Sequence, residues 1–235
     1  MEFTSDMRVE LVQSMGNDAS ILAAMLVSTV GDQSLDMLTA DTEGSQGRIN
    51  FLMKNRHGSP FEHNALTFFV EAPIAVFREW HRHRISSYNE VSGRYKVLEP
   101  KFYVPPRHRP LQQVGKPGHY EFVEGTQEQY DFMVATVKAS CRSSYQDYTD
   151  LLNQGVCKEV ARGVLPFYLF SSMYVTINLR SLMNFISLRQ HNKDSLFPSF
   201  PMWEIEECSR KMEDYFKAGF PLSHKAFVEN GYVAP

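Results

Sequence analysis

The chain has 235 residues, of which 43% are hydrophobic and 22% charged, an ordinary composition for a soluble globular protein. Its formal net charge of −3 excludes a general electrostatic attraction to nucleic acid or to membranes, so an anion site has to be a local cluster of Arg and His. The three cysteines form no C-x-x-C pair, and no signal-peptide or membrane-spanning pattern occurs, so we expect a cytoplasmic protein without disulfides.

Strand and helix patterns alternate in the first half of the chain. In chain order, the predicted elements are a strand at Met7–Ser14, a helix at Asp18–Thr29, a polar, turn-rich segment at Thr39–Gln46, a helix at Gln46–Asn55, a half-buried strand at His63–Val70, a helix from Pro73 to about Arg84, a loop at Ser86–Arg94 and a Pro-broken edge strand within Val97–Arg109. Asp18 is the expected N-cap of its helix, and Pro73 fits a first helical position. Ile74, Phe77 and Trp80 give the Pro73 helix an apolar face at helical spacing.

The second half is dominated by helical patterns. The predicted elements are a long helical region at Tyr120–Asn153 ended by Gly155, a short helix at Cys157–Val164 stopped by Pro166, a strand at Tyr168–Leu179, an amphipathic helix at Ser181–Gln190 with Leu182, Phe185 and Ile186 inward, and a helix at Trp203–Phe216. No repeat, linker or low-complexity tract interrupts the pattern. We therefore predict an α+β fold, with residues 1–235 as a single domain whose mixed, largely antiparallel sheet is packed by helices, one of them long.

The most unusual segment is Arg82–Tyr95, which reads R-H-R-I-S-S-Y-N-E-V-S-G-R-Y. Arginine forks bind phosphate in bidentate fashion, and Ser, Asn and free loop N–H groups add neutral donors. Cations at a helix C-terminus are also favoured by the helix dipole, each by a few tenths of a kcal/mol. That effect explains the R-H-R cluster alone but leaves the polar pattern after it unexplained, so the segment indicates a nucleotide phosphate site.

This segment resembles the signature R-H-R-x-x-S-x-N-x-x-S-x-R of the flavin-dependent thymidylate synthases. All fixed positions match, and they are Arg82, His83, Arg84, Ser87, Asn89, Ser92 and Arg94. Further segments are similar to the same family, namely Arg56–His63, Glu159–Arg162, Asn178–Phe185 and Leu188–Arg189. The resemblance covers roughly residues 7–215.

The resemblance implies a reaction and its cofactors. Members of this family convert dUMP to dTMP with 5,10-methylenetetrahydrofolate as carbon donor and with FAD that NADPH reduces. They are homotetramers whose active sites are built from several subunits, and their partners are small molecules rather than nucleic acid or membrane. The chain has no Rossmann G-x-G-x-x-G, so we expect NADPH to enter the open flavin site transiently.

The resemblance also assigns roles residue by residue. The positions that correspond to FAD ligands are Ser59, Arg82, His83, Arg84, Glu90, Asn178, Arg180 and Asn184. The positions that correspond to nucleotide ligands are Glu79, Arg82, Glu90, Val91, Ser92, Gly93, Arg94, Arg162 and Arg189. The expected catalytic set is Arg189, which would stabilise charge on the uracil ring, with the flavin-adjacent His57 and Ser92. No base is evident beside Ser92, so we expect it to be a hydrogen-bonding residue rather than a nucleophile. We expect no metal.

Spacing supports two of these groups. Arg180 and Asn184 are four residues apart and share one helix face, whereas Arg189 lies five residues further and is expected to turn off that face toward a different ligand. Glu79, Arg82 and His83 are expected to line one wall of the Pro73 helix.

The chain departs from the family in three places. Glu79 stands where some members carry Gln, and His191–Met202 forms a Pro- and Phe-containing insert relative to short members. The family has a His shortly after its last arginine, for which His191 is the candidate here.

Chemistries other than the flavin route fit the sequence less well. The folate-only thymidylate synthases use the Cys of a Pro-Cys-His motif, which is missing, and neither Cys141, Cys157 nor Cys208 has a neighbouring His that would lower its pKa. A binder of single-stranded nucleic acid is an alternative because Arg and Tyr mix in the signature, but the chain has no longer basic stripe. A metal hydrolase is a second alternative, and for it no H-E-x-x-H pattern occurs.

Overall fold

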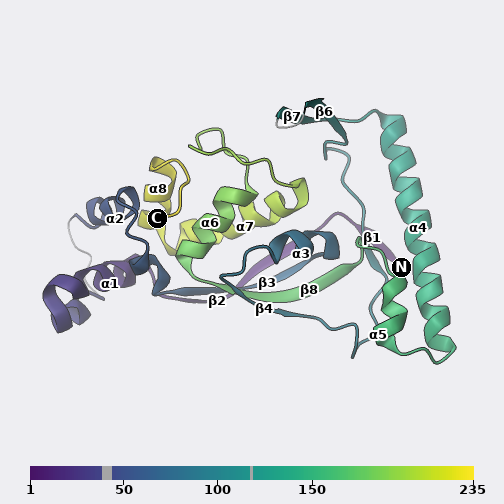
Figure 1. Ribbon diagram of the computed structural model, residues 1–235, viewed down its shortest axis with the longest axis horizontal. Coiled ribbons are helices and arrows are strands. Elements are labelled where there is room, and N and C mark those ends of the chain that lie inside the picture. The colour runs from purple at the N-terminus through teal and green to yellow at the C-terminus, as the bar shows by residue number, and fades with distance from the viewer. Residues whose placement is uncertain (39–43, 117–118) are drawn as a thin grey trace. The chain divides into compact units, whose positions relative to one another are not determined.

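Four strands form the main sheet of the structure, a computed structural model that describes residues 1–38, 44–116 and 119–235 (Figure 1). The strands lie in the order β2 (Arg8–Met15), β3 (Ala65–Pro73), β8 (Phe170–Ile177) and β4 (Ser87–Glu90), in an antiparallel sheet. Along β3, Leu66, Phe68 and Val70 are buried and their neighbours are half-buried, as the alternation predicts. The predicted α+β class is confirmed.

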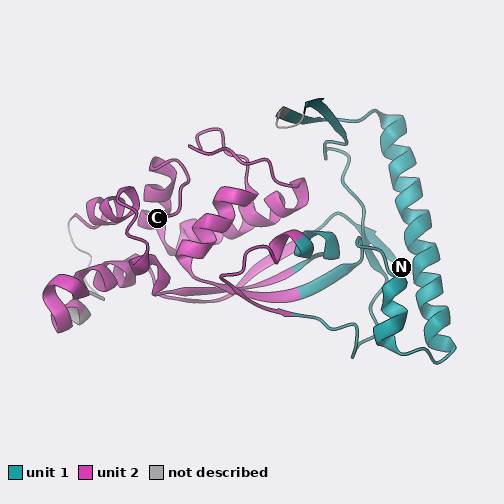
Figure 2. Ribbon diagram, in the orientation of Figure 1, with its two compact units in different colours: residues 1–7, 71–78, 90–172 teal, residues 8–70, 79–89, 173–235 magenta. Residues whose placement is uncertain are grey.

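The chain divides into two compact units, each made of several segments (Figure 2). Unit 1 contains residues 1–7, 71–78 and 90–172, and unit 2 contains residues 8–70, 79–89 and 173–235. Strands β3 and β8 contribute residues to both units. Neither unit is one continuous stretch of sequence, and the assignment of residues 1–235 to a single domain stays a prediction.

Unit 2 is mainly helical. Its helices are α1 (Asp18–Val30), the 3₁₀ helix η1 (Gly31–Leu38), α2 (Ser45–Lys54), the 3₁₀ helix η2 (Ser59–Glu62), α6 (Leu179–Arg189), α7 (Trp203–Gly219) and α8 (Pro221–Glu229). Helix α7 packs against β2 and α6, and α2 packs against α8 (Figure 1). Helix α6 buries Leu182, Phe185 and Ile186 completely, which confirms the predicted inward face and fixes the rotation of this helix.

Unit 1 contains the long helix α4 (Gln127–Asn153). Its other elements are the parallel pair β1 (Glu2–Thr4) and β5 (Lys101–Tyr103), the antiparallel pair β6 (Gln112–Lys116) and β7 (His119–Val123), α5 (Lys158–Ala161) and the 3₁₀ helix η3 (Arg162–Val164). Phe102, Cys141 and Leu169 are the centre of a core cluster. Within the described ranges, no helix is long and apolar enough to cross a membrane.

Two predicted element boundaries and one predicted loop are wrong. The long helical region begins at Gln127 rather than Tyr120, because Thr126 and Gln129 form a capping box and residues 119–123 form β7. Pro73 ends β3, and helix α3 (Ile74–Trp80) is shorter than expected. The predicted loop at Ser86–Arg94 contains β4, because pairing beside β8 overrides the turn preference of its Ser and Asn residues.

Other differences are smaller. The predicted turn-rich segment Thr39–Gln46 lies largely outside the described residues, and α2 begins at Ser45. Helix α8 and strands β1 and β6 were not predicted. The N-cap of α1 is Asn17 rather than Asp18, since the Asn17 side chain accepts from the N–H groups of Ala19 and Ser20.

Asp18 instead caps the distant helix α8. Its carboxylate accepts from the backbone N–H groups of Leu222 (2.8 Å) and Ser223 (3.0 Å) and from the Ser223 hydroxyl (2.6 Å). Leu222 and Ser223 occupy the first turn of α8, where backbone N–H groups lack partners within the helix. Asp18 is itself 8% exposed, so these hydrogen bonds are shielded from water.

Replacing Asp18 by Ala should therefore lower the free energy of unfolding by about 1.5–3 kcal/mol, because buried donors lose a charged acceptor. Asp18→Asn keeps one acceptor oxygen and should cost less. Urea unfolding of both variants measures the effect, with Asp147→Ala as a control that removes an exposed carboxylate from α4. Equal stabilities of Asp18→Ala and the control would contradict the capping role.

Candidate active site

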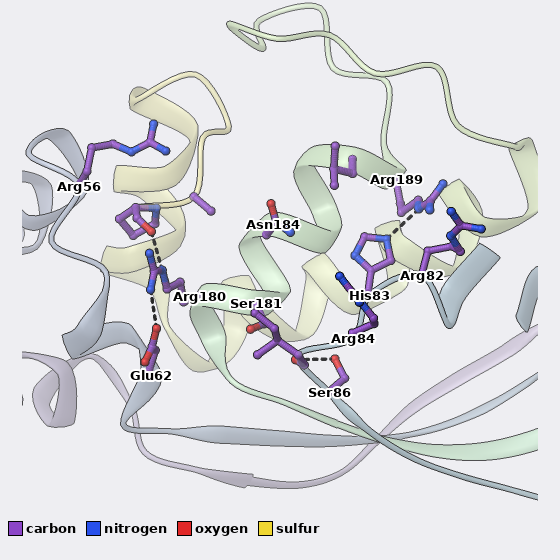
Figure 3. A pocket seen from close by; sticks show the side chains of 14 residues that line it. Arg56, Glu62, Arg82, His83, Arg84, Ser86, Arg180, Ser181, Asn184 and Arg189 are labelled. Atoms are coloured by element: carbon purple, nitrogen blue, oxygen red, sulfur yellow. Dashed lines mark hydrogen bonds and ion pairs between the residues drawn. The ribbon is translucent and has the colours of Figure 1, made fainter. Parts of the chain in front are cut away.

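An arginine-lined pocket of about 540 Å³ lies entirely within unit 2 (Figure 3). Its lining residues are Arg56, Glu62, Arg82, His83, Arg84, Ile85, Ser86, Arg180, Ser181, Asn184, Leu188, Arg189, Ala234 and Pro235. Five arginines face one carboxylate, although the whole chain is acidic. Such a local excess of positive charge favours a ligand with several negative charges.

Two segments supply most of the lining. Helix α6 contributes five residues, and its start is fixed by Asn178, whose side chain accepts from the Ser181 N–H group at 2.9 Å. The segment after α3 contributes the R-H-R cluster. There the chain leaves the α-helix, since the Arg82 and His83 N–H groups donate to the carbonyls of Glu79 and Trp80, three residues back.

The structure thus brings together six of the predicted site residues. They are Arg82, His83, Arg84, Arg180, Asn184 and Arg189 (Figure 3).

Arg189 is the most constrained of these cations. Its Nε donates to Nε2 of His83 at 2.9 Å, and its terminal nitrogens donate to the Glu79 carboxylate at 2.9 Å and to the Glu79 carbonyl at 3.3 Å. Only 17% of the Arg189 side chain is exposed, so its ion pair with Glu79 is less screened than a surface pair. These contacts fix the plane of the guanidinium. The predicted helix wall of Glu79, Arg82 and His83 does not form, because α3 ends at Trp80; Glu79 and His83 meet instead at the Arg189 guanidinium.

His83 acts as an uncharged acceptor in this group. Its ring packs edge-on against Phe185, with 4.7 Å between centroids. Burial, together with the positive charge of Arg189, lowers the pKa of His83 to about 4. At neutral pH the imidazole is therefore neutral, with Nε2 free of a proton and able to accept from Arg189.

Arg180 lies near the other end of α6. Its Nε donates to the Pro235 carbonyl at 2.7 Å, and its terminal nitrogen pairs with Glu62 at 2.6 Å. A Cβ atom added at Gly58 would lie 2.4 Å from Nε of Arg180 and 2.8 Å from the Pro235 carbonyl oxygen, so this close approach requires glycine.

Arg180 and Arg189 line the same pocket, and the expectation that Arg189 turns off the Arg180 face stays a prediction. The two residues are nine positions apart on α6, or about 13 Å along the helix axis. At about 100° per residue the two positions also lie on roughly opposite sides of the helix, so ligand groups bound near Arg180 and Arg189 would be separated both along it and around it.

A second group of predicted residues lies in unit 1, around the end of the signature. The Glu90 carboxylate accepts from the Ser171 hydroxyl at 2.7 Å, and the Ser92 hydroxyl accepts from the Arg94 N–H group at 3.3 Å. A Cβ atom at Gly93 would lie 3.1 Å from Cδ of Arg162, so the loop packs directly against that arginine. Val91 is exposed beside them.

Arg94 and Arg162 are both available to a ligand in unit 1. The Arg94 guanidinium has a long contact of 3.4 Å with Glu159 and lies over the Tyr95 ring, and about half of the Arg94 side chain is exposed. Arg162 begins η3 and is also exposed. The structure therefore brings together Gly93, Arg94 and Arg162, as the resemblance predicts.

Other predicted residues lie outside the arginine-lined pocket. His57 is exposed and stacks on Phe51, with 5.8 Å between centroids, and Ser59 is exposed at the start of η2. Asn178 caps α6, as described above. His191 contacts the carbonyl of Ser199 at 2.9 Å and stacks on Phe200, so it holds the His191–Met202 insert together.

Several pocket residues were not predicted. Arg56 and Glu62 belong to the Arg56–His63 segment, whose resemblance to the family pointed only to its His and Ser. Ala234 and Pro235 carry no local signal, because only tertiary contacts bring them to Arg180.

The cysteines do not line the pocket. Cys141 and Cys208 are buried, and burial raises the pKa of both thiols, that of Cys208 to about 12. Cys157 is exposed ahead of α5. Among the described residues, no cluster of three or more His, Cys, Asp and Glu side chains could hold a metal ion.

The sequence is similar to known enzymes over its full length. A family model described as thymidylate synthase complementing protein matches residues 10–222. A flavin-dependent thymidylate synthase from Streptomyces coelicolor is 53% identical, with 100% of this chain and 96% of the relative covered. One from Tropheryma whipplei is 48% identical, with 99% and 97% covered.

A solved structure is similar throughout the fold. It is the UMP/dUMP methylase PolB from Streptomyces cacaoi bound with 5-Br dUMP, which is 41% identical, has a TM-score of 0.94 and is covered completely, as is this chain. The family match and the relatives agree on one class of enzyme, the thymidylate synthases. Within that class, the chain belongs to the flavin-dependent thymidylate synthase family.

The neutral state of His83 has a measurable consequence. Unfolded His titrates near 6.5 and His83 in the folded protein near 4, so the unfolded chain binds an extra proton between these values. The stabilisation from the neutral imidazole is therefore complete above pH 6.5 and is lost as the pH falls toward 4.

His83→Gln keeps an acceptor for Arg189 but cannot titrate. The free energy of unfolding should fall more steeply for the wild type than for this variant between about pH 7 and about pH 5, as measured by urea unfolding. His81→Gln, which replaces an exposed neighbouring histidine, is the control. Parallel pH dependences of the wild type and His83→Gln would show that His83 is not held neutral.

Proposed function

We propose that the protein converts dUMP to dTMP, with bound FAD, with 5,10-methylenetetrahydrofolate as carbon donor and with NADPH as reductant. The observation that carries this proposal is the convergence of the R-H-R cluster and the Arg180–Asn184 face on one pocket. The R-H-R cluster belongs to the signature of the family and the Arg180–Asn184 face to another segment that resembles it, and relatives at 53% and 48% identity are flavin-dependent thymidylate synthases.

The residues of this pocket fit a flavin dinucleotide. Arg82, Arg84 and Arg180 provide fork-shaped donors for a diphosphate, and Asn184 adds a neutral amide. The remaining predicted FAD ligands are His83, Ser59, Glu90 and Asn178. When bound, the flavin supplies the reduction and the transfer of the one-carbon group. NADPH would enter the same open site transiently.

Arg189 would act on the uracil ring of the nucleotide. Its guanidinium is already held by Glu79 and His83, so little reorganisation is needed when negative charge develops at the ring N3 and the neighbouring carbonyl. Because His83 is neutral, it orients Arg189 without adding a second positive charge. Glu79 would contribute by positioning Arg189 and by contacting the nucleotide.

The nucleotide phosphate would be bound by Arg94 and Arg162, with Arg82 also assigned to it. Ser92, Gly93 and Val91 lie in the same loop and would contribute hydrogen bonds and backbone contacts. Ser92 already accepts from the Arg94 N–H group, which suits a positioning role rather than a nucleophilic one. His57 would lie beside the flavin.

We also propose a homotetramer with active sites shared between subunits. In unit 1, Phe132 on α4 is 73% exposed and Phe167 is 66% exposed, so both large apolar side chains are available to a partner subunit. Sedimentation of the purified protein tests this assembly.

Arg84→Ala and Arg189→Ala should separate the two ligands. Each change removes charge-assisted hydrogen bonds of about 1.5–3 kcal/mol, or ten- to a hundred-fold in the affected step. Arg84→Ala should yield pale protein that regains activity with added FAD. Arg189→Ala should keep its flavin colour but lose dTMP formation, and Arg189→Lys should rescue only partly, since a point charge cannot reproduce the planar fork.

The measurements are flavin absorbance after desalting and dTMP formation at saturating FAD, with UMP tested beside dUMP. If Arg189→Ala lost its flavin yet turned over fully in excess FAD, Arg189 would be a cofactor residue and the proposed division would be wrong.

The absence of a cysteine nucleophile gives an independent test. Replacing Cys141, Cys157 and Cys208 together by Ala or Ser should leave dTMP formation largely intact, provided that FAD, methylenetetrahydrofolate and a reductant are all present. The buried thiols have raised pKa values and are poor nucleophiles at neutral pH. Loss of turnover in a variant that still folds, by circular dichroism, would rule out the flavin route.

A further inference from the structure

Arg56 occupies a backbone position that favours glycine. Its φ is +60°, in the left-handed region that side chains with a Cβ rarely adopt. The His57 N–H group donates to the Leu52 carbonyl at 2.9 Å and the Arg56 N–H group to the Met53 carbonyl at 3.2 Å. This pair of bonds is the Schellman motif that ends helix α2, and Arg56 stands at the position where Gly is most common. Glycine at this position would therefore relieve the backbone strain of the folded protein.

The side chain of Arg56 lines the arginine-lined pocket (Figure 3). Arg180 and Arg189, on helix α6, are each held by a carboxylate, Glu62 and Glu79 respectively. Arg56 is exposed, and among the described residues no carboxylate or other acceptor contacts its guanidinium. Its charge and all of its donors are available to a ligand in the pocket.

We propose that Arg56 is a further phosphate-binding residue of this pocket and contacts the diphosphate of the flavin cofactor. The inference rests on the proposed function, because the ligand it names is FAD. Arg56 shares its pocket with Arg84 and Arg180, which are assigned to FAD. Arg94 and Arg162, which are assigned to the nucleotide alone, lie in unit 1. The left-handed backbone is the conformational cost of presenting a guanidinium, rather than glycine, at the end of α2.

Arg56→Gly separates the structural from the binding role, because the two effects have opposite signs. Glycine relieves the left-handed conformation, so the thermal midpoint of the flavin-free protein should rise. The same change removes a charged fork from the pocket, so the Kd for FAD should increase about ten-fold. Fluorescence quenching of FAD measures the Kd. The Kd for FAD should depend less steeply on salt concentration in Arg56→Gly than in the wild type, because one ion contact with phosphate is lost.

Two further variants sharpen the test. Arg56→Lys keeps the charge without the planar fork and should bind FAD with intermediate affinity. Lys54→Ala removes one positive charge from the last turn of α2, outside the pocket, and should leave the Kd unchanged. It controls for the change in net charge.

Each outcome is decisive. An unchanged Kd and salt dependence in Arg56→Gly, with FAD binding intact in the wild type, would overturn the inference and leave the proposed function standing. So would an equal loss of affinity in Lys54→Ala. A lowered midpoint in Arg56→Gly would overturn the strain argument. A wild-type protein that binds no FAD at all would overturn the proposed function and the inference with it.

Discussion

The site depends on how one guanidinium is held inside a crowded cluster of positive charge. Arg189 is fixed through Nε by a neutral imidazole and through its terminal nitrogens by Glu79. A charged His83 could not accept this hydrogen bond and would repel Arg189. Burial of His83 against Phe185 is therefore what allows an arginine to be both fully charged and rigidly placed. The hydrophobic face of α6 and the orientation of Arg189 are two consequences of one packing arrangement.

Helix α6 places two constrained arginines in the pocket, one near each of its ends. Its apolar face is locked into the core by Leu182, Phe185 and Ile186, so its polar side chains have fixed positions. Arg180 near the first turn is tied to Glu62 and to the Pro235 carbonyl, and Arg189 in the last turn is tied to Glu79. A rigid helix with a constrained cation near each end can hold two ligand groups at fixed positions, which is the preorganisation that binding and catalysis both need.

The sequence predicted the parts of the site that are carried by local pattern, and missed the parts made by tertiary contact. The R-H-R cluster, Arg180, Asn184 and Arg189 were identified by the signature segments, and the inward face of α6 by its periodicity. The strand β4 was missed because its Ser and Asn residues favour turns, and only pairing beside β8 makes it a strand. Asp18 was assigned to the nearer helix because its role at Leu222 and Ser223 has no signal in the local sequence. The contact of Pro235 with Arg180 is equally non-local.

Two features of the pocket lower the stability of the folded protein. Five guanidinium groups share one cavity with a single lining carboxylate, so their mutual repulsion is relieved only in part by Glu62 and by Glu79 beside Arg189. Arg56 adds a left-handed backbone to this electrostatic cost. Neither feature helps the protein fold, and negative charge entering the pocket would offset the electrostatic cost. A protein with a net charge of −3 that concentrates its arginines in this way is organised around an anion. Binding of an anion there would relieve the repulsion, so a bound ligand would add to the stability of the protein.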